Sequence, residues 1–237
     1  MQIDVPSQPA SSLKAFGLQY VMIVLGILTA LGTEQVVLTL RHQSSGEAAQ
    51  HEIEAELRAN LEDIRSTVRS NIERHKPMYA LRDELAREIQ AGTPNATIQE
   101  RIITPSKGSL TLRLSLATFR HEAWDVSVAN QSVAYIAAPV LHQYAAVYAD
   151  QRDYHGIIYA NAHALVSSSR YTDVKTDVDI GNVVPQELLR VLNQHLFAVE
   201  LTQGNLRGLE AKLAKVLSVP SEFDVGTTPA ARAAAAR

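Results

Sequence analysis

The residues best suited to binding in this sequence are large aromatic side chains. Trp124, Tyr135, Tyr144 and Tyr148 lie close together along the chain. Aromatic rings offer large apolar surfaces to ligands and to partner proteins, and their polar groups add hydrogen bonds. These four residues are therefore candidate binding residues, in a ligand pocket or in a partner groove. The alternative is that they form ordinary core at helix contacts.

The eight histidines raise the question of a metal site. No histidine follows Asp or Glu by three positions, the spacing of di-iron bundle sites, and no His-Glu-x-x-His motif occurs. Glu47 and His51 share an i,i+4 spacing without a third ligand. His75, His155 and His195 lie on or beside predicted core stripes. We expect them to be separate interior or boundary histidines rather than a proton-sensing or metal-binding cluster, and we predict no metal and no cofactor.

Motifs for catalysis are missing as well. The chain has no cysteine, which excludes thiolate nucleophiles and cysteine-ligated metals. It has no Gly-rich phosphate loop and no Gly-x-Ser-x-Gly elbow. Asp177, Asp179 and Gly181 do not fit the spacing of a calcium loop. A net charge of -3 predicts no nucleic-acid partner. We therefore assign no catalytic residue and predict that the protein is not an enzyme.

One segment has the composition of a membrane span. No charged side chain occurs from Ala15 to Thr33, and a helix of that length measures roughly 28 Å, close to the thickness of the hydrocarbon core. The apolar run resumes after Glu34 and stops at Arg41, which predicts a transmembrane helix over 15–40 with Glu34 near its exit boundary. A cleaved signal peptide and a buried helix of a soluble protein are the alternatives.

Residues within this segment also suggest helix packing. Gly26 and Ala30 form a small-xxx-small pair, and Glu34 lies one turn further on. Small residues let two membrane helices approach closely, and Glu34 could reach headgroups or a partner helix. Self-association through Gly26, Ala30 and Glu34 is therefore one hypothesis, and a helix without a partner is the other.

A long amphipathic pattern follows the membrane segment. Apolar residues recur at spacings of three and four, which predicts a stalk or bundle helix over 47–91. Its stripe consists of Ile53, Leu57, Leu61, Ile64, Val68 and Ile72. We expect a polar joint over 43–46 and a break near Pro77, because proline lacks the N–H of a helix interior. Residues 1–14 have the composition of a flexible tail.

The remainder of the chain is predicted to be a helical bundle domain over 92–217. Alternating leucines from Leu110 to Leu116 follow the period of a strand and allow a small β-hairpin. Pro139 and Pro185 suit the first turns of two long helices, and a polar linker is expected over 171–182. Residues 218–237 are predicted to be a disordered tail. The fold class is thus mainly α: one N-terminal transmembrane helix, plus an extracytoplasmic antiparallel helical bundle.

Two stretches resemble a known group of proteins. The run from Val21 to Leu31 is similar to the "VxLGILIAL" anchor of uncharacterised proteobacterial single-pass inner-membrane proteins. The stretch that includes Trp124 and Tyr135 and ends at 144–151 is similar to the "AW…Y…YxxVYxxQ" helical region of that group. The likeness covers Phe16 to Tyr154, although Glu34 and the residues after it replace the Asn-Asn-Trp-like continuation of the anchor. The resemblance implies a bacterial inner-membrane anchor with a periplasmic domain, and no enzymatic activity.

These observations together predict a membrane-anchored helical interaction or scaffold module. Its expected partners are the lipid bilayer, a further copy of itself and a protein that the sequence does not identify. Self-association would use the membrane helix or the helices with heptad-like spacing. A periplasmic sensory module that binds a small ligand is the first alternative. A membrane-tethered hydrolase is the second.

Overall fold

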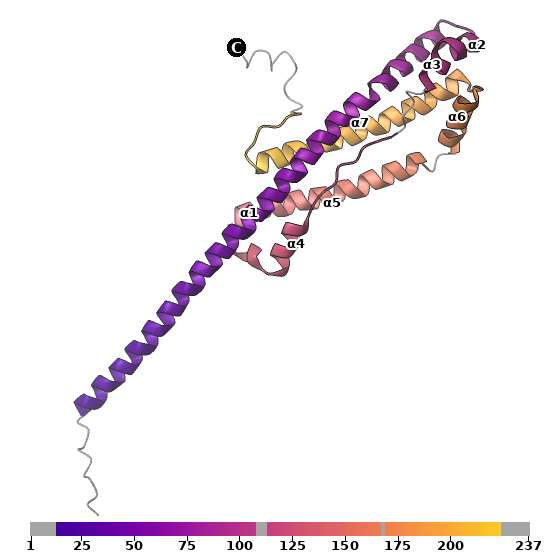
Figure 1. The fold of residues 1–237 in the computed structure, drawn as a ribbon. Helices are drawn as coiled ribbons and strands as arrows, with labels where there is room; N and C mark the ends of the chain where they lie inside the picture. The colour runs from indigo at the N-terminus through magenta and orange to yellow at the C-terminus, as the bar shows by residue number, and fades with distance from the viewer. Residues whose placement is uncertain (1–12, 108–112, 167–168, 224–237) are drawn as a thin grey trace, which may run out of the picture.

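The computed structural model describes residues 13–107, 113–166 and 169–223, and its main feature is one very long helix. Helix α1 runs from Leu13 to Gln90 without interruption. Its N-terminal part projects alone, and its C-terminal part is covered by the rest of the chain (Figure 1). The predicted joint over 43–46 is therefore wrong: the apolar segment and the amphipathic helix form a single helix.

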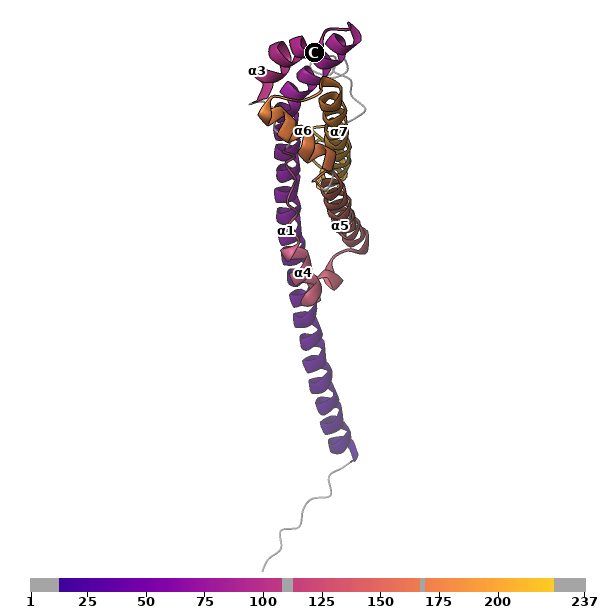
Figure 2. The same cartoon turned by 90° about the vertical axis from the view of Figure 1, so that its right-hand side faces the viewer.

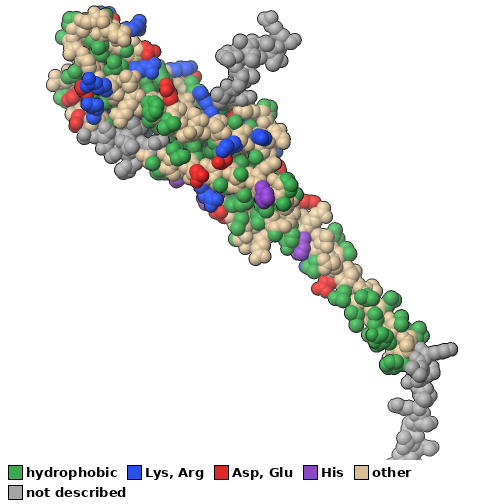
Figure 3. Space-filling model, turned by 180° about the vertical axis from the view of Figure 1, so that it is seen from behind, with side chains coloured by type: hydrophobic (Ala, Val, Ile, Leu, Met, Phe, Trp, Pro, Cys, Tyr) green, Lys and Arg blue, Asp and Glu red, His purple; other side chains and the backbone are tan. Residues whose placement is uncertain are grey.

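The projecting part of α1 is a candidate membrane span. Its most apolar 18-residue window has a mean hydropathy of 2.0, and none of that window is buried in the protein. Large apolar side chains from Phe16 to Leu40 are exposed, and they cover the free end of the molecule on the face seen in Figure 3. A core helix of a soluble protein would bury such residues. This distribution therefore supports the membrane interpretation.

The domain is built on three long helices: α1, α5 (Ala138–Val166) and α7 (Pro185–Val216). Helices α1 and α5 run in the same direction, and α7 runs antiparallel to both (Figures 1 and 2). The predicted helix starts at Pro139 and Pro185 are confirmed. The predicted stripe of α1 is also confirmed, because Ile53 to Val68 lie in the core and Ile72 is partly buried.

Short elements close the two ends of this bundle. At the membrane-proximal end, α4 (Glu122–Ala129) and the 3₁₀-helix η3 (Ser132–Tyr135) form a corner against α1. A second core lies at the opposite end, where the chain adds four elements. These are α2 (Asn95–Ile98), the π-helix η1 (Gln99–Ile103), α3 (Thr104–Ser106) and α6 (Ser169–Ile180).

An extended segment returns the chain from the distal end to the corner. Two fully buried asparagines of α1 bind its backbone. The Asn71 side chain donates to the Ser115 carbonyl and accepts from the Ser115 N–H, at 2.8 and 3.0 Å. The Asn60 side chain does the same for Arg120, at 2.8 and 2.9 Å. The two asparagines are about three helical turns apart on one face, so they match the length of the extended chain between their partners.

This arrangement replaces the β-hairpin that the alternating leucines allowed. Part of that pattern, residues 108–112, lies outside the described residues. The following residues 113–121 form neither helix nor strand, and no strand occurs among the residues that the structure describes. Asparagine side chains supply the hydrogen bonds that a second strand would have supplied. The other half of the proposed hairpin, Ile102 and Ile103, is helical and buried.

Three further expectations differ from the structure. Helix α1 continues through Pro77, which is exposed together with Glu73, so water can reach the carbonyl that the missing N–H leaves free. Most of the expected polar linker over 171–182 is helix α6, which buries Val174 and Val178. Within the predicted disordered tail, Ser221 and Glu222 bind Glu210 of α7, and Glu222 also pairs with Arg69 of α1. Residues 224–237 of that tail and residues 1–12 lie outside the described part of the chain.

Candidate functional site

The corner formed by α4 and η3 contacts α1 just beyond the candidate membrane span. The rings of His42 and Tyr135 stack with centroids 4.1 Å apart and planes 11° apart. One turn further along α1, Gly46 is buried against the backbone of Tyr135. A Cβ atom at Gly46 would lie 2.6 Å from the Tyr135 carbonyl oxygen. The close approach of η3 to α1 therefore requires glycine at this position.

The requirement for glycine gives a test of the corner. Gly46→Ala should lower the free energy of unfolding by about 1–2 kcal/mol, because overpacking against a backbone atom exceeds the gain in helix propensity. Gly204→Ala is the matched control: it lies exposed in α7 with no atom within 4 Å of the added carbon, and it should raise stability by about 0.5–1 kcal/mol. Denaturant midpoints measure both. If both substitutions stabilised the protein equally, the close contact between Gly46 and the Tyr135 backbone would be contradicted.

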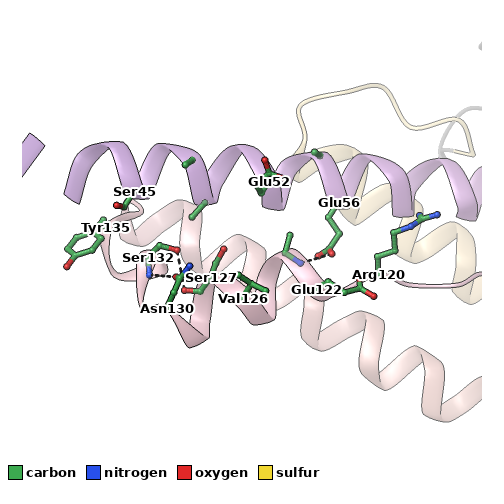
Figure 4. A pocket seen from close by; sticks show the side chains of 14 residues that line it. Ser45, Glu52, Glu56, Arg120, Glu122, Val126, Ser127, Asn130, Ser132 and Tyr135 are labelled. Carbon is green, nitrogen blue, oxygen red and sulfur yellow. Dashed lines mark hydrogen bonds between the residues drawn. The ribbon is translucent and has the colours of Figure 1, made fainter. Parts of the chain in front are cut away.

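A groove of about 850 Å³ lies between α1 and the corner. Its α1 wall carries mostly small side chains, and its other wall is formed by α4 and η3 (Figure 4). The α1 lining comprises Ser45, Ala48, Ala49, Glu52, Ala55 and Glu56. The opposite lining includes Glu122, Val126, Ser127, Ser132 and Tyr135. The α1 lining of the groove begins at Ser45, so the groove lies at the end of the domain next to the candidate span.

The charge of the groove is negative. Glu56 is only 9% exposed and accepts hydrogen bonds from the Tyr148 hydroxyl at 2.5 Å and from the Ala123 N–H at 2.8 Å. Hydrogen bonds from the N–H groups of Glu122 and His121 lower the pKa of the Glu122 carboxyl. Glu52 is mostly exposed. Arg120 also lines the groove, but its guanidinium is paired with Asp63 at 2.9 Å. The carboxylates therefore dominate the local charge.

A second and smaller cavity, of about 320 Å³, lies on the other side of α4. Trp124 and Tyr148 stack in its wall, with ring centroids 5.0 Å apart and planes 28° apart. Burial, and then the hydrogen bond to Glu56, raise the pKa of the Tyr148 hydroxyl, which is therefore a donor at neutral pH. We call this cavity the aromatic pocket; its lining consists of Phe119, His121, Trp124, Asp125, Tyr148, Gln151, Arg152 and His155.

The four candidate aromatic residues thus fall into three environments. Trp124 and Tyr148 share the aromatic pocket. Tyr135 lies apart from them in the groove. Tyr144 is buried in the core and donates a hydrogen bond to Glu54 at 2.8 Å. Sequence spacing cannot separate these cases, because α4 and η3 turn the chain between Trp124 and Tyr144.

Several lining residues were not identified from the sequence. The small residues of α1 that line the groove are common in any helix and carry no signal of their own. Gln151 offered a better clue, since it is a polar residue on the mostly apolar stripe of α5 and is buried there. His155 lies on the same stripe but is exposed beside Tyr159, with ring centroids 4.3 Å apart.

The histidines differ from expectation in one respect. His75 and His195 are not separate: their buried rings lie 5.4 Å apart, between α1 and α7. The Nε2 atom of each has no hydrogen-bond partner among the described residues. Glu47 and His51 gain no further ligand, and the described ranges contain no group of three or more His, Asp or Glu side chains placed to hold a metal ion.

The proposed membrane-packing residues lie on the free part of α1. Gly26, Ala30 and Glu34 are all exposed, and no atom lies within 4 Å of a Cβ built at Gly26. This face is therefore open to a second helix. Self-association through it stays a prediction.

The fold defines a class of protein: a helical domain built on three long helices, of which the first extends beyond the domain as a candidate membrane span. No family model, curated protein or solved structure matches the chain. Its function must therefore be argued from the two cavities beside α4 and from their position next to the span.

Proposed function

We propose that the protein is a membrane-anchored interaction module, whose groove holds a basic segment of a neighbouring membrane protein. In this proposal α1 spans the bacterial inner membrane once, and the helical domain lies on the periplasmic side. The position and charge of the groove carry the proposal. It is a large acidic cavity, and it lies next to the point where α1 leaves the candidate span.

Continuity of α1 supports a module of this kind. A single helix joins the apolar segment to core residues such as Ile53 and Leu57. A flexible joint would let the domain rotate freely relative to its anchor, whereas a continuous helix holds the groove at one height above the bilayer. A partner embedded in the same membrane would then present its own membrane-proximal segment at that height.

The lining of the groove indicates the chemistry of the partner. Ala48, Ala49 and Ala55 leave room for the side chains of an incoming segment, and Val126 and Tyr135 supply apolar contact. Lys or Arg of the incoming segment would pair with Glu52 and Glu122 at the rim. Charges placed in this way favour a basic partner over an acidic one and increase its rate of association.

Photocrosslinking in intact membranes tests this proposal. A photoreactive amino acid at Ala48 should give one discrete adduct. The same group at Glu47, an exposed α1 residue outside the groove lining, should give little. Replacing both Glu52 and Glu122 with lysine should reduce the Ala48 adduct about tenfold or more, since two ionic contacts become repulsive. Equal adducts from both positions, or an adduct that the double substitution leaves unchanged, would reject the groove as a docking site.

A further inference from the structure

The aromatic pocket contains a buried polar group without a partner. Gln151 is 3% exposed and lines the pocket. Its Oε1 atom accepts a hydrogen bond from the Asn60 side chain at 3.4 Å, which orients the amide. Its Nε2 atom is buried and has no hydrogen-bond partner among the described residues. A buried donor left unpaired is costly, and an acceptor bound in the pocket that Gln151 lines would satisfy it.

The charges around the pocket indicate an anionic acceptor. The oxygen of Asp125, the acidic residue of the lining, that lies nearest His121 already accepts a hydrogen bond from the imidazole Nδ1, at 2.7 Å. Arg152 lies in the same lining, and no carboxylate of the described residues pairs with it. A guanidinium and an amide N–H in one pocket match the two oxygens of a carboxylate.

The remaining walls indicate a flat apolar body. Phe119, Trp124 and Tyr148 supply aromatic surface next to these donors. A volume of about 320 Å³ lies at the lower end of the range of small-molecule sites, and it is sufficient for a single ring with a short substituent. The pocket therefore combines a planar apolar wall with a site for one negative group.

We propose that the aromatic pocket binds a small planar carboxylate, whose ring lies against Trp124 and whose carboxylate accepts hydrogen bonds from Gln151 and Arg152. This site lies across α4 from the groove and does not depend on the proposed docking function. Two hydrogen bonds join the linings of the two cavities: Tyr148 of the pocket donates its hydroxyl to Glu56 of the groove, and the N–H of His121 donates to Glu122.

Binding can be measured with 4-fluorobenzoate as the probe and the full chain in lipid nanodiscs. Titration should give saturable broadening of the ¹⁹F signal, and it should change the fluorescence of Trp124, the single tryptophan of the chain. Empty nanodiscs correct for partition into lipid. The neutral analogue 4-fluorobenzamide should bind about tenfold more weakly, because it lacks the charge that Arg152 recognises.

Substitutions in the aromatic pocket test which residues bind 4-fluorobenzoate. Arg152→Gln should weaken 4-fluorobenzoate binding about tenfold or more, and Arg152→Lys should restore part of it. Arg190→Gln, an exposed α7 residue outside the pocket lining, should leave binding unchanged. Gln151→Leu should weaken binding without changing the helical circular dichroism signal. No saturable binding up to millimolar probe, or equal affinity for the wild type and Arg152→Gln, would overturn the proposal while leaving the groove proposal intact.

Discussion

Replacing Glu210 with alanine should lower the free energy of unfolding by about 3–5 kcal/mol, because a partly buried guanidinium loses its closest and fully buried partner and keeps only a longer ion pair, to Glu222 at 3.7 Å. The Glu210 side chain is fully buried in α7 and pairs with Arg65 of α1 at 2.7 Å. It also accepts hydrogen bonds from the Ser221 hydroxyl and the Glu222 N–H, at 2.5 and 2.9 Å. The same carboxylate therefore joins α1 to α7 and holds the segment that follows α7.

The control for this experiment is an exposed ion pair. Glu73→Ala removes the i,i+3 partner of Lys76, and both side chains are mostly exposed. It should cost less than about 1 kcal/mol. Replacing Arg65 and Glu210 together with apolar residues should recover much of the loss, since no charge is then left buried. Urea unfolding measures all three variants. A loss for Glu210→Ala no larger than that for Glu73→Ala would show that the buried pair is dispensable.

Acidification from pH 7.5 to pH 5 should lower stability by about 2 kcal/mol through His195 alone. Burial and then the nearby His75 lower the pKa of His195 to about 4, and the residue is 2% exposed. Because this folded-state pKa lies below the unfolded value of about 6.5, the contribution is complete above pH 6.5 and is lost as the pH falls toward 4.

The charged groups near His75 and His195 lower the histidine pKa further, and the other groups that face the pair are uncharged at neutral pH. Burial and the charge of Arg74 lower the pKa of His75, although its Nδ1–H donates to the Asn71 carbonyl at 2.7 Å. From α6, the Tyr171 ring approaches His195 at 6.4 Å, and burial raises the pKa of its hydroxyl to about 12. Protonation of either imidazole therefore places a positive charge in a site without a described carboxylate partner.

His195→Leu tests this account, because the Nε2 atom of His195 makes no hydrogen bond that the substitution could remove. Stability at pH 7.5 should change little, and its dependence on pH between 6.5 and 4 should flatten. The exposed His155→Gln should keep the wild-type profile. An unchanged slope for His195→Leu would assign the acid sensitivity to other groups. Glu210 does not interfere in this window. Burial alone would raise its pKa, but hydrogen bonds from Glu222, Ser221 and Arg65 lower it below 4.5, so its contribution is lost only at lower pH.

Structural features that depend only on residues close together in the sequence were predictable from the sequence. The candidate span follows from a long run without charged side chains, and the core face of α1 follows from the spacing of Ile53 to Val68. Pro139 and Pro185 mark helix starts because their missing N–H groups would be unsatisfied there in any case. The alternation from Leu110 to Leu116 predicted a strand, but no strand occurs among the described residues, and the backbone of that region pairs with asparagine side chains of α1 instead.

Contacts between residues distant in sequence were not predictable in this way. The pairing of Asn60 and Asn71 with the returning chain, the approach of His75 to His195 and the buried contacts of Glu210 all join segments that only folding brings together. The division of Trp124, Tyr148 and Tyr135 between two cavities has the same cause. The sequence by itself determined which faces are apolar, because periodicity and composition are local properties. Only the tertiary structure decided which polar groups meet, because their partners lie tens of residues away and are selected by packing.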